Sequence, residues 1–315
     1  MTQTQKKEKN TINFIPVICG PTASGKTALA IELAKKINGE IVSADSMQIY
    51  QDMDIGTAKP TLIEQQNIKH YLIGTVSPSI RYSVADFKKD AKKAIKEIIK
   101  KSKNPIIVGG TGLYIDSLIY EIEYPNIEFD EKYREILEKR VNEEGLDCLY
   151  KEAKKIDPEA IIKISKNDKK RILRILEIYK ATGKNKTEQD KQSRRKDAEY
   201  KYKVYALNWE RQKLYDRINI RVDNMIEEGL IDEVKELIKK YSKLPTAMQG
   251  LGYKEVIEYL NEKITKEEMI EKIKRESRRY AKRQITWFKK NKQTIWLDGE
   301  NNIQNNLKII LEGKN

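Results

Sequence analysis

The stretch VICGPTASGKTALA, residues 17–30, constrains the fold of this chain more than any other part of it. Its centre, GPTASGKT from Gly20 to Thr27, fits the phosphate-binding pattern G-x-x-x-x-G-K-[S/T]. A short apolar run precedes the pattern, and a helix-like repeat of leucine and isoleucine follows it. A strand, a glycine loop and a helix in this order let backbone N–H groups and a helix N-terminus enclose phosphate oxygens. The sequence therefore predicts a phosphate site within an α/β fold.

Two side chains of this loop have no place in an ordinary glycine turn. Lys26 supplies a mobile cation, and the hydroxyl of Thr27 suits a Mg²⁺ ligand. The pattern does not identify the phosphate compound. A nucleotide contains a diphosphate, and so does an activated alkyl diphosphate.

The first third of the chain alternates between strand-like and helix-like segments. FIPVIC, EIVSADS, YLIGTV and PIIVGG are short apolar runs typical of buried strands, and the amphipathic segment 84–102 lies between the last two. This alternation predicts a parallel sheet covered by helices on both faces, as in P-loop NTPases.

The character of the chain changes near Pro125. Residues 126–201 are strand-poor, and Asp157-Pro158 and Asn167-Asp168 are typical of helix starts. We predict an all-helical insertion domain there, in which the polar segment 183–201 is a loop or linker. Residues 1–125 and 202–315 form the predicted core domain. In its second part, VYALNW and TIWLD predict strands, two helices are separated near Gly229, and a long basic helix spans about 266–290.

The charge distribution points to a polyanionic partner. The net charge is +14, and residues 272–292 contain ten Lys or Arg and one acid. Such a stripe suits RNA phosphates, whereas a lysine-rich solvated surface and a membrane surface are the alternatives. No apolar run is long enough to span a membrane, and we expect no signal peptide, because MTQTQKKEKN has no apolar segment behind its lysines. Cys19 and Cys148 fit neither a disulfide framework nor a zinc site. We therefore expect a cytoplasmic protein with Cys19 in the core.

Two further residues are expected at the edge of the sheet where the phosphate loop lies. Asp45 follows a predicted strand, and it is a magnesium residue, a general base or a turn aspartate. Thr111 follows another strand, and it either lies near the phosphates or caps the next helix.

Six motifs in order give a specific resemblance: GPTASGKT, SADSMQIYQDMDIGTAKP, YSVADF, VGGTGLY, TAMQGLGYKE and AKRQITWF. Together they resemble the bacterial tRNA dimethylallyltransferase family, also called tRNA isopentenyltransferases. The resemblance extends from about residue 15 to residue 298. It is weakest in the insertion, where NDKKRILRILEIY also fits.

The resemblance implies transfer of a dimethylallyl group from dimethylallyl diphosphate to the exocyclic amine of the adenosine 3′ of the anticodon in tRNA. Diphosphate is released, with Mg²⁺ as cofactor. Asp45 is then the general base, Thr111 lies near the donor, Arg221 reaches the diphosphate and Thr27 ligates the metal. The helical pattern alone leaves Arg221 equally consistent with a solvated face shared with Arg217. The implied diphosphate-binding residues are Gly20, Thr22, Ala23, Ser24, Gly25, Lys26 and Thr27.

The same resemblance implies a tRNA interface, with the insertion gripping the anticodon stem, and we expect a monomer that does not bind membranes. The implied contact residues are Asp45, Ser46, Met47, Gln48, Lys170, Arg171, Arg174, Gln249, Gly250, Gly252, Tyr253, Lys254, Lys282, Arg283, Gln284, Trp287 and Lys289. Gln48 is expected on the edge of the flipped adenine. We interpret His70 as structural.

Three other functions remain open at the level of sequence. A small-molecule P-loop kinase would share the fold and leave the basic helix unexplained. An alkyl transferase acting on free adenine nucleotide would need neither the insertion nor the basic stripe. A non-catalytic RNA-binding protein that uses nucleotide as a switch would not need Asp45 and Arg221 beside the loop.

Overall fold

The structure is a computed structural model that describes residues 13–124, 130–193 and 197–313. The chain divides into two compact units. One contains residues up to 119 together with those from 199 onward, and the other contains residues 120–198.

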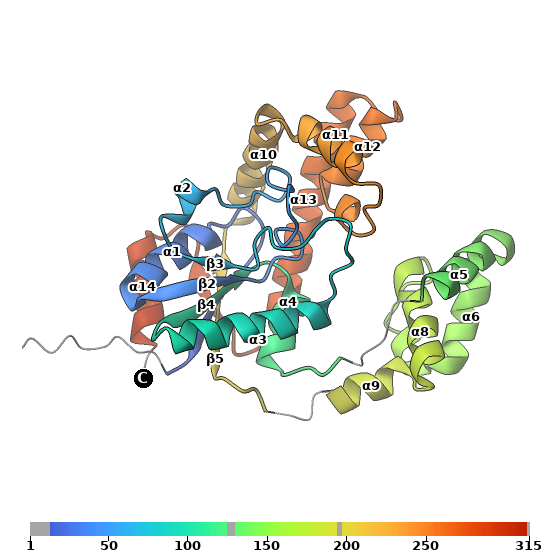
Figure 1. Ribbon diagram of the computed structural model, residues 1–315, viewed down its shortest axis with the longest axis horizontal. Helices are drawn as coiled ribbons and strands as arrows, with labels where there is room; N and C mark the ends of the chain where they lie inside the picture. The colour runs from blue at the N-terminus through green and yellow to red at the C-terminus, as the bar shows by residue number, and fades with distance from the viewer. Residues whose placement is uncertain (1–12, 125–129, 194–196, 314–315) are drawn as a thin grey trace, which may run out of the picture. The chain divides into compact units, whose positions relative to one another are not determined.

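The first unit is built on a six-stranded, all-parallel sheet (Figure 1). Its strand order is β3-β2-β4-β1-β5-β6. The strands are β1 (Ile15–Cys19), β2 (Gly39–Ser43), β3 (His70–Tyr71), β4 (Asn104–Gly109), β5 (Tyr202–Asn208) and β6 (Ile295–Asp298). The predicted α/β fold with a parallel sheet is confirmed. Because β1 lies between β4 and β5, the phosphate loop that follows it emerges from the interior of the sheet.

Of the predicted strand YLIGTV, only Tyr71 pairs with β2; the observed β3 is His70–Tyr71. The backbone turns at Leu72 and Gly74, both of which have positive φ. The N–H groups of Thr75 and Val76 then bond to the carbonyl of Ile49 instead of a sheet neighbour. A left-handed backbone ends a strand even where the side chains favour one.

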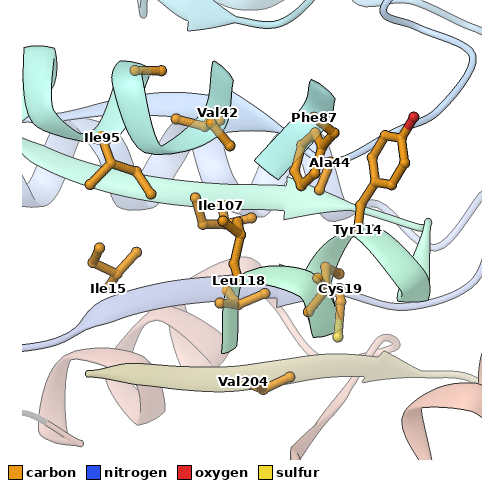
Figure 2. Close-up of a cluster of buried hydrophobic side chains, with 14 of the residues drawn as sticks. Ile15, Cys19, Val42, Ala44, Phe87, Ile95, Ile107, Tyr114, Leu118 and Val204 are labelled. Carbon is orange, nitrogen blue, oxygen red and sulfur yellow. The ribbon is translucent and has the colours of Figure 1, made fainter. Parts of the chain in front are cut away.

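Helices cover both faces of this sheet. α1 (Lys26–Ile37) and α14 (Ile303–Glu312) pack on one face, and α3 (Val84–Lys100) and α4 (Gly112–Ile119) pack on the other. Figure 2 shows the second face, where Phe87 and Tyr114 lie beside the aliphatic side chains of the strands. Cys19 is buried in this cluster, as predicted. The helix α14 was not predicted.

A further group of helices follows β5. The predicted interruption at Gly229 is confirmed, because Gly229 has φ of 100° between two helices. The long basic helix is also observed. These helices are α10 (Arg211–Glu227), α11 (Leu230–Lys240), α12 (Tyr253–Leu260) and α13 (Lys266–Phe288). One more short helix, α2 (Leu62–Gln65), lies between β2 and β3.

The second unit has its own apolar core around Leu137, Leu149 and Leu176. Asp157 and Asp168 cap helices, as the sequence predicted. Its helices are α5 (Glu131–Glu144), α6 (Leu146–Ile156), α7 (Pro158–Ile161), α8 (Lys169–Thr182) and α9 (Lys186–Ser193). The prediction of a loop over 183–201 is wrong for α9. The carboxylate of Asp157 binds the backbone N–H and hydroxyl of Thr187, a tertiary contact that no local periodicity reveals.

We expect Phe87→Ala to lower the free energy of unfolding by about 3–5 kcal/mol, because it empties a buried site. The Phe87 ring is 1% exposed and stacks on Tyr114 with ring centroids 4.1 Å apart. Urea unfolding measures the change. Ile99→Ala on the same helix removes a side chain that is 43% exposed, and it should cost below about 1 kcal/mol. Equal losses in the two variants would contradict the packing described here.

Candidate functional site

A cavity of about 380 Å³ lies in the first unit, at the carboxyl ends of β1, β2 and β4. Helices α10 and α13 and residues 249–254 complete its wall. A second hollow, of about 590 Å³, is lined by the phosphate loop and α10. The two hollows have six lining residues in common: Lys26, Thr27, Ala58, Pro60, Arg221 and Met225. The cationic side chains of the loop and of α10 therefore face both spaces.

The phosphate loop depends on backbone conformations that favour glycine. Gly20 has φ of 138°, and a Cβ there would lie 3.0 Å from the carbonyl oxygen of Leu207 in the neighbouring strand. Gly25 is left-handed at φ 89°, directly before α1. The Ser24 hydroxyl is buried and has no hydrogen-bond partner among the described residues. An unpartnered buried hydroxyl in this position fits a ligand that accepts or donates a hydrogen bond.

Two side chains that the sequence left unassigned support the loop from outside. Arg217 Nε donates to the carbonyl of Ala23 at 2.8 Å, and its guanidinium lies over the ring of Trp209. Trp209 Nε1 donates to the carbonyl of Ser24 at 3.0 Å. The sequence predicted Arg217 and Arg221 on one helix face. In the structure, Arg217 bonds to the phosphate loop, and Arg221 lines the cavity.

Lys26 is half-buried and lies close to both a positive and a negative side chain. Its Nζ donates to the carbonyl of Pro21 at 2.6 Å. Burial lowers the pKa of Lys26 to about 8; the positive charge of Arg221 also lowers it, while Asp45 acts in the opposite direction. Burial likewise lowers the pKa of Arg221, whose Nη2 donates to the carbonyl of Thr57 at 3.3 Å. Two partly buried cations, one of which lowers the pKa of the other, form a site that favours an anion.

Asp45 lines the cavity two residues beyond the end of β2. Its Oδ1 accepts from the backbone N–H of Met47 at 2.9 Å and of Gln48 at 3.3 Å. Its Oδ2 has no hydrogen bond to the described residues. Asp45 therefore acts as a turn aspartate through Oδ1, as the sequence analysis allowed. Its Oδ2 remains able to accept a proton.

Thr111 supports the segment that contains Asp45. Its Oγ1 accepts from the backbone N–H of Ser46 at 3.0 Å and donates to the Ser46 hydroxyl at 3.3 Å. Thr111 is not among the residues that line the cavity. No side-chain cap of α4 is observed in the described part of the chain, and the expectation that Thr111 lies near the donor stays a prediction.

The other predicted residues of the segment 45–48 also line the cavity. Gln48 Nε2 donates to the carbonyls of Thr57 and Ala58 at 3.2 and 3.0 Å, which leaves its Oε1 as the acceptor. His70, interpreted as structural from sequence, lines the same cavity while its Nδ1 lies 2.8 Å from the carbonyl of Ile68.

The predicted residues of the QGLGYK motif form another part of the wall. Gln249, Gly250, Gly252, Tyr253 and Lys254 all line the cavity. The Tyr253 side chain is buried, and burial followed by the nearby carboxylate of Glu233 raises its pKa strongly. Its hydroxyl is committed to Glu233 at 2.6 Å. Sequence reasoning did not single out Glu233.

Helix α13 has exposed cations on one face and buried side chains on the other. Lys282, Arg283 and Lys289 are exposed, as an RNA-facing stripe requires. Gln284, predicted as an RNA contact, is 5% exposed. Its Oε1 accepts from the backbone N–H of Thr22 at 2.8 Å, and its Nε2 donates to the carbonyl of Gly110 at 2.9 Å.

The N–H of Thr22 is therefore occupied by Gln284, although the Thr22 side chain lines the cavity. Trp287 is half-buried, and its Nε1 donates to Asp116 at 3.0 Å. The remaining predicted RNA contacts, Lys170, Arg171 and Arg174, are exposed on α8 in the second unit, and Arg174 pairs with Glu177.

The protein side chains offer few ligands for a metal ion. Among the described residues, no group of three or more His, Cys, Asp or Glu could hold one. The Thr27 hydroxyl lines the cavity together with Asp45. This sparse set fits a magnesium ion that takes most of its ligands from phosphate oxygens and water. No helix in the described part of the chain has the length and apolar character needed to cross a membrane.

Comparisons with known proteins agree on one family. The family model described as IPP transferase matches residues 48–291. A tRNA dimethylallyltransferase from Acetivibrio thermocellus is 49% identical over 94% of this chain and 96% of its own length. One from Thermoanaerobacter sp. is 54% identical over 87% of this chain and 88% of its own.

Solved structures give the same result. The tRNA isopentenylpyrophosphate transferase of Bacillus halodurans has a TM-score of 0.71 at 42% identity, and 96% of each chain is covered. A eukaryotic dimethylallyltransferase, studied while acting on tRNA, has a TM-score of 0.75 at 34% identity, over 90% of this chain and 73% of its own. A phosphate loop beside Asp45 and Arg221, a family match over most of the length and relatives near 50% identity lead to one conclusion: this chain belongs to the IPP transferase family of tRNA dimethylallyltransferases, which are prenyltransferase enzymes.

Proposed function

We propose that this enzyme transfers a dimethylallyl group from dimethylallyl diphosphate to the exocyclic amine of the adenosine 3′ of the anticodon in tRNA. The observation that carries the proposal is one cavity lined by the half-buried cations Lys26 and Arg221 together with Asp45. The names of the similar proteins support tRNA as acceptor and dimethylallyl as the transferred group.

The donor diphosphate is assigned to the phosphate loop. The N–H groups at the start of α1, the Ser24 hydroxyl, Lys26 and Arg221 all favour negative charge there. When the bond between the allylic carbon and the diphosphate oxygen breaks, that charge increases on the leaving group. Groups that are already oriented toward it stabilise the transition state more than the ground state.

The acceptor base is assigned to the side of the cavity formed by Asp45 and Gln48. The new bond joins the amine nitrogen to the allylic carbon, and one proton leaves the nitrogen. Asp45 Oδ2 has no hydrogen bond to the described residues and accepts that proton. The Gln48 Oε1 suits an N–H donor on the base edge, because its Nε2 is held by two carbonyls. The base must leave its stack, which costs less in a single-stranded loop than in a duplex.

Magnesium fits on the donor side. Thr27 would ligate it together with diphosphate oxygens, and the bound ion would supply positive charge to the leaving group.

The RNA is assigned to the exposed cations of α13 and, in the second unit, to Lys170, Arg171 and Arg174 of α8. Contacts to phosphates provide affinity and orientation, whereas the groups in the cavity choose the base. This division favours the tRNA enzyme over a small-molecule kinase or a transferase acting on free nucleotide, since neither of these uses a basic stripe.

We expect radioactive dimethylallyl diphosphate and Mg²⁺ to label unmodified tRNA that has adenosine 3′ of the anticodon. The same tRNA with guanosine at that position should stay unlabelled, because guanosine has a carbonyl oxygen at the ring position where adenosine has its amine. Free AMP is assayed in parallel. Label in AMP would move the function to nucleotide prenylation, and ATP turnover without any transfer would favour a kinase.

We expect Asp45→Asn to lower kcat by about 10²- to 10⁴-fold, because the amide cannot take the proton. The variant retains an oxygen for the turn to Met47 and Gln48, so the local fold is preserved. Affinity for tRNA should change by less than about threefold, since phosphate contacts dominate it. Single-turnover rates and filter binding measure the two quantities, with the exposed Asp216→Asn as control. A single-turnover rate near the unmodified enzyme's would refute the assignment of Asp45 as base.

The pKa of Lys26, lowered to about 8 by burial and by Arg221, gives a pH dependence. Protonated Lys26 attracts the diphosphate, so the binding form predominates below pH about 8 and is lost above it. We expect kcat/KM for dimethylallyl diphosphate to fall about tenfold per pH unit on the alkaline side. Rates measured from pH 6.5 to 9.5 test this. Lys26→Gln should be slow and should lack the alkaline decline; a decline that persists in this variant would assign the titration to another group.

A further inference from the structure

Glu233, in α11, lies outside both hollows, yet its carboxylate accepts four hydrogen bonds. Oε2 accepts from the backbone N–H groups of Asp54 and Ile55 at 2.8 and 2.7 Å. Oε1 accepts from the N–H of Gly56 at 3.1 Å and from the hydroxyl of Tyr253 at 2.6 Å. Three consecutive N–H groups of one loop thus converge on a single charged side chain. Bonds of this kind to a carboxylate are about twice as strong as bonds between neutral groups.

The loop held in this way has no regular structure of its own. Its last residue, Ala58, has φ of 43°, a left-handed conformation that a non-glycine residue adopts only when its surroundings impose it. Gly56 lies flat against Tyr253, because a Cβ at Gly56 would come within 2.6 Å of the ring. Glu233, which lies outside the cavity, and Tyr253, which lines it, therefore fix this loop together.

The opposite side of the same loop faces the cavity. The carbonyl of Thr57 accepts from Arg221 Nη2 at 3.3 Å and from Gln48 Nε2 at 3.2 Å. The carbonyl of Ala58 accepts from Gln48 Nε2 at 3.0 Å. The loop thus orients one side chain assigned to the donor diphosphate and another assigned to the acceptor base.

We propose that Glu233 is a positioning residue for the transfer reaction. It fixes residues 54–58 so that the carbonyls of Thr57 and Ala58 hold Arg221 and Gln48 in their reactive orientations. This inference rests on the proposed function for its link to transfer, but the control of Arg221 by Glu233 stands on the geometry alone. Displacement of a catalytic group by about 1 Å can cost about 100-fold in rate, so a residue outside the cavity can affect turnover.

The first test measures binding of inorganic pyrophosphate to the free enzyme by calorimetry. Glu233→Gln has nearly the same shape but turns an amide N–H₂ toward the loop N–H groups, and we expect it to weaken binding about tenfold as Arg221 loses its orientation. The matched control is Glu236→Gln, an identical change of charge on the exposed face of the same helix, which should leave binding unchanged. Equal affinities for these two variants would overturn the proposal.

A double-mutant cycle separates positioning from general destabilisation. If Glu233 acts on pyrophosphate through Arg221, then adding Glu233→Gln to Arg221→Gln should cause no further loss of binding. If Glu233 only stabilises the fold, the two losses should combine independently, and that result would overturn the proposal. Should Glu233→Gln fail to fold, Glu233→Asp takes its place in the cycle, because it retains the charge and shortens the reach to the loop.

Transfer kinetics connect this effect to the reaction. We expect Glu233→Gln to lower kcat/KM for dimethylallyl diphosphate at least as much as it weakens pyrophosphate binding, while the Kd for tRNA measured by filter binding stays constant. A loss of tRNA affinity with normal pyrophosphate binding would overturn the proposal. The two hypotheses fail separately: absence of tRNA labelling by the unmodified enzyme would refute the proposed function, whereas the pyrophosphate cycle would still decide the role of Glu233.

Discussion

The site depends on an electrostatic arrangement that is unfavourable in the absence of an anion. Lys26 and Arg221 are both half-buried, desolvation lowers the pKa of each, and the charge of Arg221 lowers the pKa of Lys26 further. A fold tolerates two desolvated cations beside one cavity when a ligand with several negative charges neutralises them. A diphosphate meets that requirement, and its departure from an allylic carbon increases the charge that the two cations attract.

The rest of the first unit holds these cations and Asp45 in one place. The parallel sheet brings the ends of β1, β2 and β4 to one edge, which places the phosphate loop, Asp45 and Thr111 near each other. Side chains from α10, α11 and α13 then fix this edge: Arg217 binds the phosphate loop, Glu233 binds the loop 54–56, and Gln284 joins Thr22 to Gly110. Each of these bonds joins segments remote in sequence, so the site is only as rigid as the packing of the helices on the sheet.

Much of the architecture was accessible to sequence reasoning, because periodicity and glycine position are local signals. The phosphate loop, five of the six strands, the break at Gly229 and the long basic helix were all located in this way. The third strand and α9 were not, since a left-handed backbone at Leu72 and a contact from Asp157 to Thr187 override local preference. The observed contacts of Thr111 and Gln284 show the same limit: their side chains bond to Ser46, Thr22 and Gly110, and sequence patterns do not encode these partners.

The sequence by itself determined the chemistry that is available: a phosphate loop with Lys26 and Thr27, an acid after a strand, a basic helix and the family to which these belong. Residue type and spacing are sufficient for this, because each motif functions over a few consecutive residues. The tertiary structure alone decided which polar atoms are free to act. In that structure the N–H of Thr22 bonds to Gln284, and Asp45 Oδ2 has no bond to the described residues. Glu233 binds the loop whose carbonyl contacts Arg221. The physical reason is that hydrogen bonds and burial are properties of groups brought together from distant parts of the chain, and no local pattern records them.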